Sequence, residues 1–364
     1  MTQLTAITYN LRDGGGDDRR LARQLDLLAR LNPSVLALQE CKWWDRNGCR
    51  LLHRAERVLR MRGFLAQSNH HGCHIGLFVR ESACTRVTGW YPDRAAPYWH
   101  ALARLVTEVD GYRRPLHIVG AHLAPSSPAI RLAEAETFSL LTGPGHDVIA
   151  LGDFNAIPAT GPDPELGGVP RIKARRKLDR RPAQAIEDAG FTDAGTQAGN
   201  RAPTVGFTGP DRLAYACGRI YTTLPPQAVA GYQVVGADEP GTGPAGAITG
   251  QALAAVRELS DHLPAAAVFT LGSDPTAAPA APPWHPGSRR TTPQHVCGQA
   301  VKRNRKDFFP GRNPQEGSDA RLIRRRRESR HPELVSSRKG NRRPWWCRVC
   351  GSAVVSRWCR CWRR

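Results

Sequence analysis

Apolar residues recur along the first part of the chain with the two periods that distinguish strands from helices. The runs Leu4–Leu11 and Ser34–Gln39 are short, apolar and rich in β-branched residues, which predicts buried strands. Between them, Arg19–Leu31 carries leucines at helical spacing and is stopped by Asn32 and Pro33. The chain is therefore predicted to begin with a strand, a helix and a second strand.

The same pattern continues to about residue 270, with strands and helices in alternation. Strands are predicted at His74–Arg80, Tyr98–Val109, Leu116–Leu123, Val148–Leu151 and Ala265–Thr270, with weaker candidates at Arg212–Ala216 and Gln233–Val235. Helices are predicted at Leu51–Arg62, Pro128–Leu141 and Pro182–Gly190.

The stretch Val148–Ala156 concentrates candidate chemistry in a few residues. Its apolar run ends at Gly152 and is followed by Asp153 and Asn155. Because side chains alternate in an extended chain, these two polar groups are predicted to point the same way. Aspartate and asparagine also favour turns, so the stretch by itself is equally typical of an ordinary strand end.

Other polar residues stand near the predicted ends of other strands, and strand ends in packed sheets converge on one edge. The full set is Asn10, Glu40, His122, Asp153, Asn155, Asp211, Asp261 and His262. It is rich in hard oxygen ligands and has no cysteine at comparable positions, which favours Mg²⁺ or Mn²⁺ over Zn²⁺. Carboxylate and imidazole groups beside such a metal can activate water and stabilise developing charge. There is no Gly-x-Ser-x-Gly sequence, the motif that carries the serine nucleophile of a Ser-His-Asp triad in α/β-hydrolases.

The net charge of +20 is concentrated in the C-terminal part of the 364-residue chain. Residues 271–364 hold 22 basic and 6 acidic residues, a net of +16, so the remaining 30 basic and 26 acidic residues give only +4. A Pro/Ala-rich stretch at 275–283 is predicted to be a linker, and the basic tail that follows lacks apolar periodicity, which is typical of disorder. We therefore predict a folded domain at 1–272 and a disordered tail at 273–364.

Three interpretations of this tail remain open. It is basic and carries interleaved tryptophans, as nucleic-acid-binding tails do. Cys347 and Cys350 are spaced as in zinc sites, although Cys359 and Cys361 are not. The abrupt change in composition also fits an extension that is not native to the domain.

The remaining composition favours an intracellular protein. Five cysteines are irregularly spaced before residue 271, which does not suggest a disulfide framework and fits a reducing compartment. No secretory leader precedes the first strand, and no run of about 18 apolar residues predicts a membrane span. The expectation is a cytoplasmic protein without a transmembrane segment.

Six short motifs in order resemble the endonuclease/exonuclease/phosphatase superfamily, which includes the pancreatic-type deoxyribonucleases. They are TYNL with Asn10, ALQE with Glu40, GAHLAP with His122, GDFNA with Asp153 and Asn155, PDRLAYACG with Asp211, and SDHLP with Asp261 and His262. The resemblance covers roughly residues 1–272. It implies an α/β fold, a four-layer sandwich of two packed mixed β-sheets with helices outside.

The resemblance also implies a reaction, the metal-assisted attack of water on a phosphodiester or phosphomonoester. Glu40 would be the main metal ligand, with Asn10 and Asp261 near the metal. Asp153 would position and activate the water, and Asn155 would hold the water or a phosphoryl oxygen. Asp211 would orient His262, which would contact the phosphate, and His122 would be a second phosphate contact or an acid.

Two features depart from that family or go beyond it. In the deoxyribonucleases a glutamate orients the first histidine, but the corresponding region here, residues 68–74, is SNHHGCH and holds no acidic residue. His74 is either a substitute or a strand-edge histidine. The basic stretch 171–181, read as a loop, offers Arg171, Lys173, Arg175 and Arg176 as candidate contacts for a phosphate backbone or as a solvated surface.

The sequence thus predicts a Mg²⁺-dependent, nuclease-like phosphodiesterase acting on a phosphate ester, with nucleic acid as a candidate substrate. Two alternatives stay open. One is a hydrolase of small phosphate esters or lipid head groups, and the other is a nucleic-acid-binding protein whose site is idle.

Overall fold

A computed structural model describes residues 1–82, 86–166, 168–207, 213–237 and 255–272 of the chain. All of them belong to the first of two compact units, Met1–Val301. The predicted linker and basic tail from residue 273 lie outside the described residues, and so do Asp211 and part of its motif.

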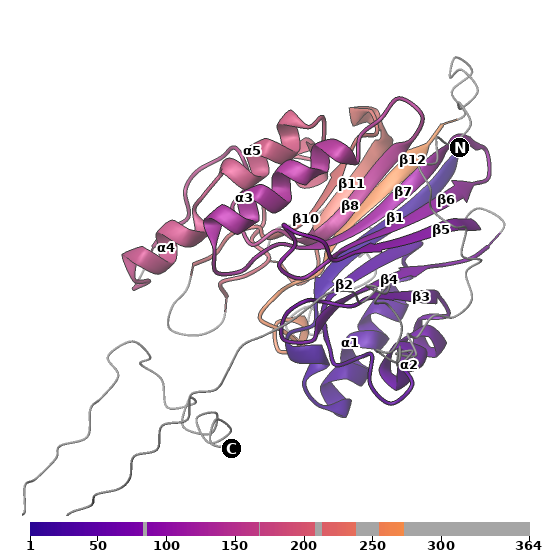
Figure 1. Cartoon of the computed structure of the whole chain (residues 1–364), viewed down its shortest axis with the longest axis horizontal. Helices are drawn as coiled ribbons and strands as arrows, with labels where there is room; N and C mark the ends of the chain where they lie inside the picture. Colours follow the sequence, from indigo (N-terminus) through magenta and orange to yellow (C-terminus); the bar gives the residue numbers. More distant parts are fainter. Residues whose placement is uncertain (83–85, 167, 208–212, 238–254, 273–364) are drawn as a thin grey trace, which may run out of the picture. The chain divides into compact units, whose positions relative to one another are not determined.

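Two six-stranded mixed sheets form the centre of this unit (Figure 1). The first has the order β11-β12-β1-β2-β4-β3, and its strands are β1 (Thr2–Asn10), β2 (Val35–Lys42), β3 (Arg62–Ala66), β4 (Cys73–Val79), β11 (Val229–Val234) and β12 (Ala265–Leu271). The second has the order β5-β6-β7-β8-β10-β9, and its strands are β5 (Arg86–Asp93), β6 (Leu102–Val109), β7 (Tyr112–His122), β8 (Asp147–Asp153), β9 (Thr192–Asp193) and β10 (Gly218–Thr222). Each sheet contains one parallel pair, β1 with β2 and β7 with β8.

Helices cover the outer faces of the sheets, so the predicted four-layer α/β sandwich is confirmed. Figure 1 shows α1 (Asp18–Leu31) and α2 (Arg50–Leu59) on the side of β2 and β4, and α3 (Pro128–Glu136) and α5 (Arg181–Asp188) on the side of β8 and β10. The shorter helices are α4 (Arg171–Lys177), α6 (Ala194–Gln197) and three 3-10 turns, η1 (Asp13–Gly15), η2 (Thr137–Leu140) and η3 (Pro226–Ala228).

Local sequence explains where the main helices begin. The Asp17 side chain accepts a hydrogen bond from the Arg20 backbone N–H at the start of α1, which satisfies one of the free donors of the first turn. At α3 the Ser127 side chain does the same for Ile130, and Pro128 occupies the first turn, where no N–H is needed. Both caps fix the loops that lead from strand ends into the helices.

The largest apolar cluster lies between the two sheets and under α1 and α2. Ile7 of β1, Leu77 of β4 and Leu151 of β8 are fully buried in it. A second cluster packs α3 and α5 against the other sheet through Phe138, Phe154 and Phe191. Burial of one such side chain contributes about 1.5–3 kcal/mol, so these layers hold the strand ends in register.

Several sequence predictions differ from the structure. Strands β3 and β5 were not predicted. The strand that follows the Asp211 region is β10, which begins at Gly218, so the strand predicted at Arg212–Ala216 is wrong for its described residues 213–216. The stretch read as a loop at 171–181 contains α4 and the start of α5. Cys49 is disulfide-bonded, although the irregular cysteine spacing did not suggest a disulfide framework, whereas Cys41, Cys73 and Cys217 are free thiols. No helix in the described ranges is long and apolar enough to cross a membrane.

Candidate active site

The polar residues predicted at strand ends meet where β1 of one sheet approaches β8 of the other. The Asn10 amide group lies between two carboxylates: Nδ2 donates to Glu40 Oε1 at 3.2 Å and to Asp153 Oδ2 at 3.0 Å. Asn10 ends β1 and Asp153 ends β8, so this single side chain joins the two sheets. The structure therefore brings these three side chains together.

Glu40 reaches the site because β2 is irregular at this point. The register between β2 and β4 shifts between Leu38 and Cys41, and Glu40 has a φ of 53°, which a non-glycine residue adopts rarely. Such a bulge re-aims one side chain out of the strand's alternation. The Asp13 backbone N–H then donates to Glu40 Oε2 at 2.8 Å and fixes the carboxylate.

Asp261 is linked to the same group through Arg12. The Arg12 backbone N–H donates to Asn10 Oδ1 at 2.9 Å, and its Nε lies 3.9 Å from Asp261 Oδ1. The Ser260 hydroxyl donates to the Asn10 backbone carbonyl at 2.9 Å, which anchors the segment that carries Asp261. Asn10, Glu40 and Asp261 therefore form one connected set of oxygen-bearing groups.

Two histidines flank the Asp153 carboxylate. The Nε2 atoms of His122 and His262 each lie 3.7 Å from Asp153 Oδ2, and Asp153 itself is only 1% exposed. Burial raises the pKa of Asp153, but the neighbouring His262, His122 and Lys177 and the hydrogen bond from Asn10 outweigh it and hold the pKa well below its usual value. The carboxylate is therefore ionised at neutral pH and accepts rather than donates hydrogen bonds.

Asn155 shares the site with Asp153, although not by strand alternation. β8 ends at Asp153, and Asn155 lies beyond it with a φ of 51°. Its backbone N–H donates to Asp153 Oδ1 at 3.0 Å and its Nδ2 donates to the Leu123 carbonyl at 3.0 Å. A tight turn, rather than the extended strand that was predicted, therefore brings Asp153 and Asn155 together.

Lys177 is a site residue that the sequence reading missed. Its Nζ donates to Asn155 Oδ1 at 2.6 Å from the last position of α4. Burial lowers the pKa of Lys177, and the nearby Asp153 opposes that effect. The only sequence signal was its place in the basic stretch, where it looked like one surface cation among several.

The other face of His262 contacts a thiol. Cys217 Sγ lies 3.7 Å from His262 Nδ1 and is buried at the entrance to β10. Burial raises the pKa of the Cys217 thiol well above its usual value. Asp211, predicted to orient His262, lies outside the described residues, so among the described groups Cys217 is the neighbour at Nδ1.

In the part of the chain that the structure describes, no carboxylate bonds to the second nitrogen of His122, as its sequence context suggested. Among the described residues its buried Nδ1 has no hydrogen-bond partner, and its ring stacks on His100 with 4.2 Å between centroids and 13° between planes. Burial lowers the pKa of both rings, that of His100 to about 2. His74 is not a substitute partner, because its Nε2 lies 2.9 Å from Asp45 and its Nδ1 accepts the Ser68 N–H.

The donor atoms separate into two groups with different preferences for a metal. Glu40, Asn10 and Asp261 offer hard oxygen atoms, which suit Mg²⁺ or Mn²⁺. Asp153, Cys217 and His262 also place potential ligand atoms within 4.8 Å of one another. However, the Lys177 ammonium lowers the pKa of both Asp153 and Cys217, so this second set of ligand atoms already has a cation near it. The hard-oxygen group is the better fit for a divalent ion.

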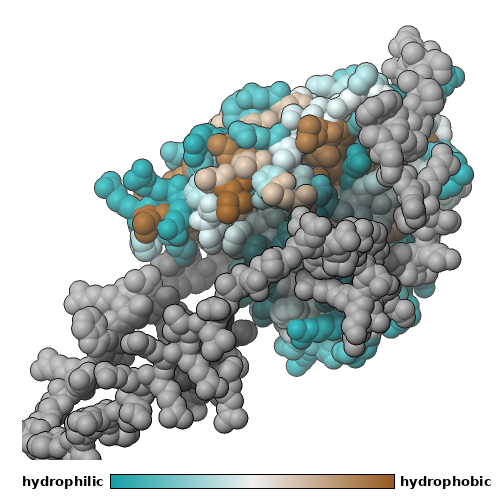
Figure 2. All heavy atoms as spheres, viewed as in Figure 1, coloured by the Kyte–Doolittle hydropathy of each residue, from teal (hydrophilic) through white to brown (hydrophobic). Residues whose placement is uncertain are grey.

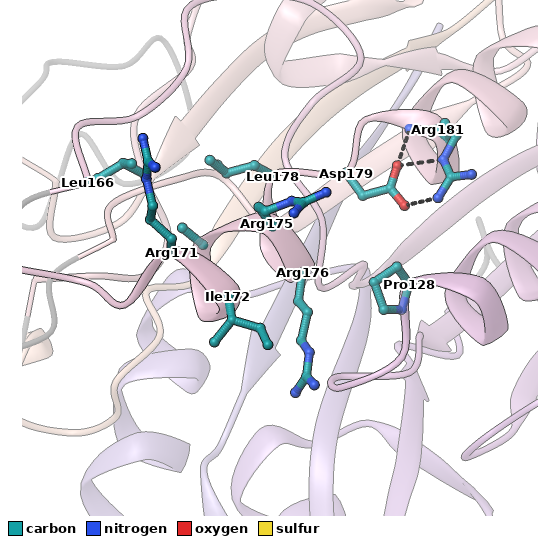
Figure 3. Close-up of a pocket in the computed structure, with 10 residues that line it drawn as sticks. Pro128, Leu166, Arg171, Ile172, Arg175, Arg176, Leu178, Asp179 and Arg181 are labelled. Carbon is teal, nitrogen blue, oxygen red and sulfur yellow. Dashed lines mark hydrogen bonds and ion pairs between the residues drawn. The ribbon is translucent and has the colours of Figure 1, made fainter.

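The four predicted substrate-binding residues Arg171, Lys173, Arg175 and Arg176 all lie on α4, which ends at Lys177. In the described part of the chain, Arg180 pairs with Asp163 and Arg181 with Asp179, whereas Arg171, Arg175 and Arg176 have no ion-pair partner. These three line a cavity of about 840 Å³ with apolar neighbours such as Ile172 and Leu178 (Figure 3). Figure 2 shows hydrophilic and hydrophobic residues interleaved over this end of the molecule.

Glu134 of α3 braces the loop that follows His122. Its Oε2 accepts the Ala124 N–H and its Oε1 accepts the Trp99 N–H, both at 2.6 Å. Burial raises the pKa of Glu134 to about 7, against a usual value of 4.5. Because the folded state holds the proton more tightly than the unfolded state, its contribution to stability is largest below pH 4.5. That contribution falls as pH rises to 7, by about 3 kcal/mol.

We therefore expect Glu134→Gln to flatten the dependence of the melting temperature on pH. From pH 5 to pH 8 the melting temperature of the unsubstituted chain should fall further than that of the variant. Glu136→Gln, an exposed position on the same helix, is the control and should keep the original dependence. Parallel curves for all three proteins would show that Glu134 does not titrate in this range.

Comparison with known proteins places this geometry in a family. The Endonuclease/Exonuclease/phosphatase family profile matches residues 7–262, which is most of the chain. No curated protein matches the sequence. The family assignment therefore depends on the family profile, and similarity to solved structures bears on the fold alone.

Solved structures share the fold at low sequence identity. D. rerio TDP2 complexed with single strand DNA product is 16% identical, with a TM-score of 0.51 over 74% of this chain and 100% of that one. Humanized D. rerio TDP2 is 16% identical, with a TM-score of 0.50 over 74% and 99%. The human Nocturnin catalytic domain is 14% identical, with a TM-score of 0.49 over 74% and 93%. With the profile match, the chain belongs to the endonuclease/exonuclease/phosphatase family and is an enzyme of the hydrolase class.

Proposed function

We propose that this enzyme cleaves phosphodiester bonds of nucleic acid by metal-assisted attack of water. The observation that carries the proposal is the buried Asp153 carboxylate, which is held by Asn10 and flanked by the Nε2 atoms of His122 and His262. An ionised carboxylate enclosed by neutral and cationic donors suits a reaction in which water is aligned and a phosphoryl group gains negative charge.

Each side chain has a role that follows from its surroundings. Asp153 accepts a hydrogen bond from the attacking water and aligns it, since its low pKa keeps it ionised. His262, 14% exposed at its side chain, donates to a phosphoryl oxygen. His122 is buried and its pKa is lowered, so it acts as a neutral hydrogen-bond donor rather than a cation. Asn155, held by Lys177, contacts a second oxygen.

Glu40, Asn10 and Asp261 would hold the divalent ion that the family implies. Their oxygen atoms have the chemistry that Mg²⁺ prefers, and Mn²⁺ is an alternative. A bound ion would neutralise phosphate charge and stabilise the leaving oxygen. Asn10 also connects this group to Asp153, so a shift of either sheet would change the distance between metal ligands and water-aligning carboxylate.

We propose that Lys177 supplies a fixed positive charge to the phosphoryl group. Lys177→Met keeps the length of the side chain and removes the charge, and we expect it to lower kcat about 10²-fold, because one preorganised charge donor is lost. Lys177→Arg should retain more activity than the methionine variant. Steady-state kinetics, with Arg30→Met at an exposed position in the last turn of α1 as the control, will measure this. If the kcat of Lys177→Met is within tenfold of that of the unsubstituted enzyme, Lys177 only holds Asn155 in place and does not stabilise the phosphoryl group.

The function itself is tested by nicking of supercoiled plasmid with Mg²⁺, beside the same reaction in EDTA. We expect nicking by the full chain and a loss of about 10²-fold or more in His262→Ala. A chain ending at Gly272 is expected to nick as well, because β12 completes the first sheet by residue 271; we propose that residues 1–272 are the catalytic domain.

The possible failures of this test differ in meaning. No nicking, with hydrolysis of small phosphate esters or lipid head groups, would keep the catalytic site and replace the substrate. Failure on every ester, with retained binding of nucleic acid, would leave a binding protein with an idle site. Nicking that survives His262→Ala would contradict the role of that histidine.

A further inference from the structure

A second cavity lies next to the segment that carries His100, and three of the residues that line it are aromatic. It has a volume of about 510 Å³ and is lined by Asn69, His70, Ala96, Pro97, Tyr98, Trp99, Ala129, Ile130 and Ala133. The His70 and Trp99 rings stack with 3.8 Å between centroids and 20° between planes. The indole is only partly buried, so the cavity offers a flat apolar surface to a ligand.

This cavity is tied directly to the catalytic groups. Trp99 precedes His100, whose ring stacks on His122. The Trp99 backbone is also braced through Glu134 to Ala124, two residues after His122. A ligand that contacts Trp99 is therefore adjacent in sequence to His100, and the His100 ring stacks on the candidate catalytic residue His122.

The first turn of α3 separates this aromatic cavity from the arginine-lined cavity described above. Pro128 lines the arginine cavity, whereas Ala129 and Ile130 line the aromatic one. A ligand that crosses this turn would meet unpaired guanidinium groups on one side and an indole on the other. Proteins bind single strands with this combination, because cationic grooves follow the phosphates and aromatic rings stack on bases.

We propose that the two cavities bind one single-stranded nucleic acid, with an unpaired base against Trp99 and its phosphates along Arg171, Arg175 and Arg176. The inference rests on the proposed function, since this strand would be the substrate, and in a supercoiled plasmid it would be a locally unpaired segment. Paired bases are already stacked within a duplex and cannot enter the aromatic cavity. A lipid could contact the arginines through its phosphate and Ile172 through its acyl chain, but it has no planar ring to stack on His70 and Trp99. The aromatic cavity therefore favours a base over an acyl chain.

Binding can be measured without turnover, on the full chain in EDTA, by fluorescence anisotropy of a labelled ten-nucleotide oligothymidylate. A matched strand carries abasic residues in place of the bases. We expect the abasic strand to bind about tenfold more weakly to the unsubstituted protein. Trp99→Ala should bind the normal strand about tenfold more weakly and the abasic strand almost unchanged, so that the difference between the strands disappears.

Further variants separate the base from the phosphates. Trp99→Phe keeps an aromatic face and should retain most of the preference for bases, which also guards against a fold damaged by alanine. Arg175→Ala should weaken both strands equally and reduce the salt dependence of binding. Tyr91→Ala, an exposed aromatic residue on β5 outside both cavities, is the control and should change neither.

Three results would overturn the inference. They are an unchanged base preference in Trp99→Ala, a duplex bound as tightly as the single strand, and displacement of the strand by phosphatidylglycerol vesicles with no effect of base removal. Plasmid nicking without base-dependent binding would reject this inference alone. Base-dependent binding without any hydrolysis would reject the proposed reaction and leave this binding site in place.

Discussion

Asp153→Asn is expected to lower the rate of phosphodiester hydrolysis by about 10²–10⁴-fold, the usual contribution of a positioned acid–base group. The asparagine keeps the shape of the side chain, but it replaces one acceptor oxygen with a donor. Asn10 Nδ2 and the two histidines would then face an amide that can no longer align water in the same way. Single-turnover hydrolysis of a labelled oligonucleotide with Mg²⁺ is the measurement.

The same strand offers a matched control for this substitution. Asp147 begins β8, at the end far from the site, where its carboxylate accepts a hydrogen bond from the Tyr112 hydroxyl and forms an ion pair with Arg114. Asp147→Asn removes the same charge from the same strand and should leave the rate within a few-fold. Equal loss of activity in both variants would show that Asp153→Asn acts by destabilising the fold. Full activity in both variants would show that Asp153 has no catalytic role.

Glu40→Gln is expected to remove metal-dependent turnover, with a loss of about 10³-fold at the Mg²⁺ concentration that saturates the unsubstituted enzyme. Glutamine can still accept the Asp13 N–H, so the bulge in β2 should survive. The lost group is the negative oxygen that would face the metal. Calorimetric titration with Mg²⁺ should show the affinity falling in parallel with the rate.

A glutamate away from the site provides the control for this second variant. Glu81 pairs with Arg62 at the surface, and Glu81→Gln should change neither Mg²⁺ affinity nor rate. An unchanged Mg²⁺ affinity in Glu40→Gln would place the metal elsewhere, and the Asp153, Cys217 and His262 group would be the next candidate.

Four of the site residues that the sequence predicted share one physical property: each stands at or near the end of a strongly buried strand. Asn10, Glu40, His122 and Asp153 come after apolar runs that have no other stable place than the centre of a sheet, so their positions follow from the strands. Glu40 was predicted at the right edge for an incomplete reason, since a bulge and a positive φ, invisible in the sequence, aim its side chain.

The parts that were missed depend on contacts between distant segments. Lys177 belongs to a stretch whose only visible feature is charge, and nothing local distinguishes it from Arg176, which lies one residue earlier and lines a cavity instead. Cys217 and His100 lie beside His262 and His122 only because separate loops pack together. Strand β5 was missed because most of it is exposed, so it lacks the apolar run that marked the others.

The hydrogen bond from Asn10 to Asp153 has a consequence beyond local geometry. Its two ends belong to different sheets, so the reactive centre exists only while the sheets are docked in one relative position. Each sheet could keep all of its own hydrogen bonds between strands while the enzyme loses its activity. Substitutions in the packing between the sheets, at Leu77 of β4 or Leu151 of β8, will therefore lower the rate of hydrolysis although neither side chain is a reacting group. The rate depends on the alignment of the two layers, and the hydrogen-bonded ladder of either layer alone does not determine that alignment.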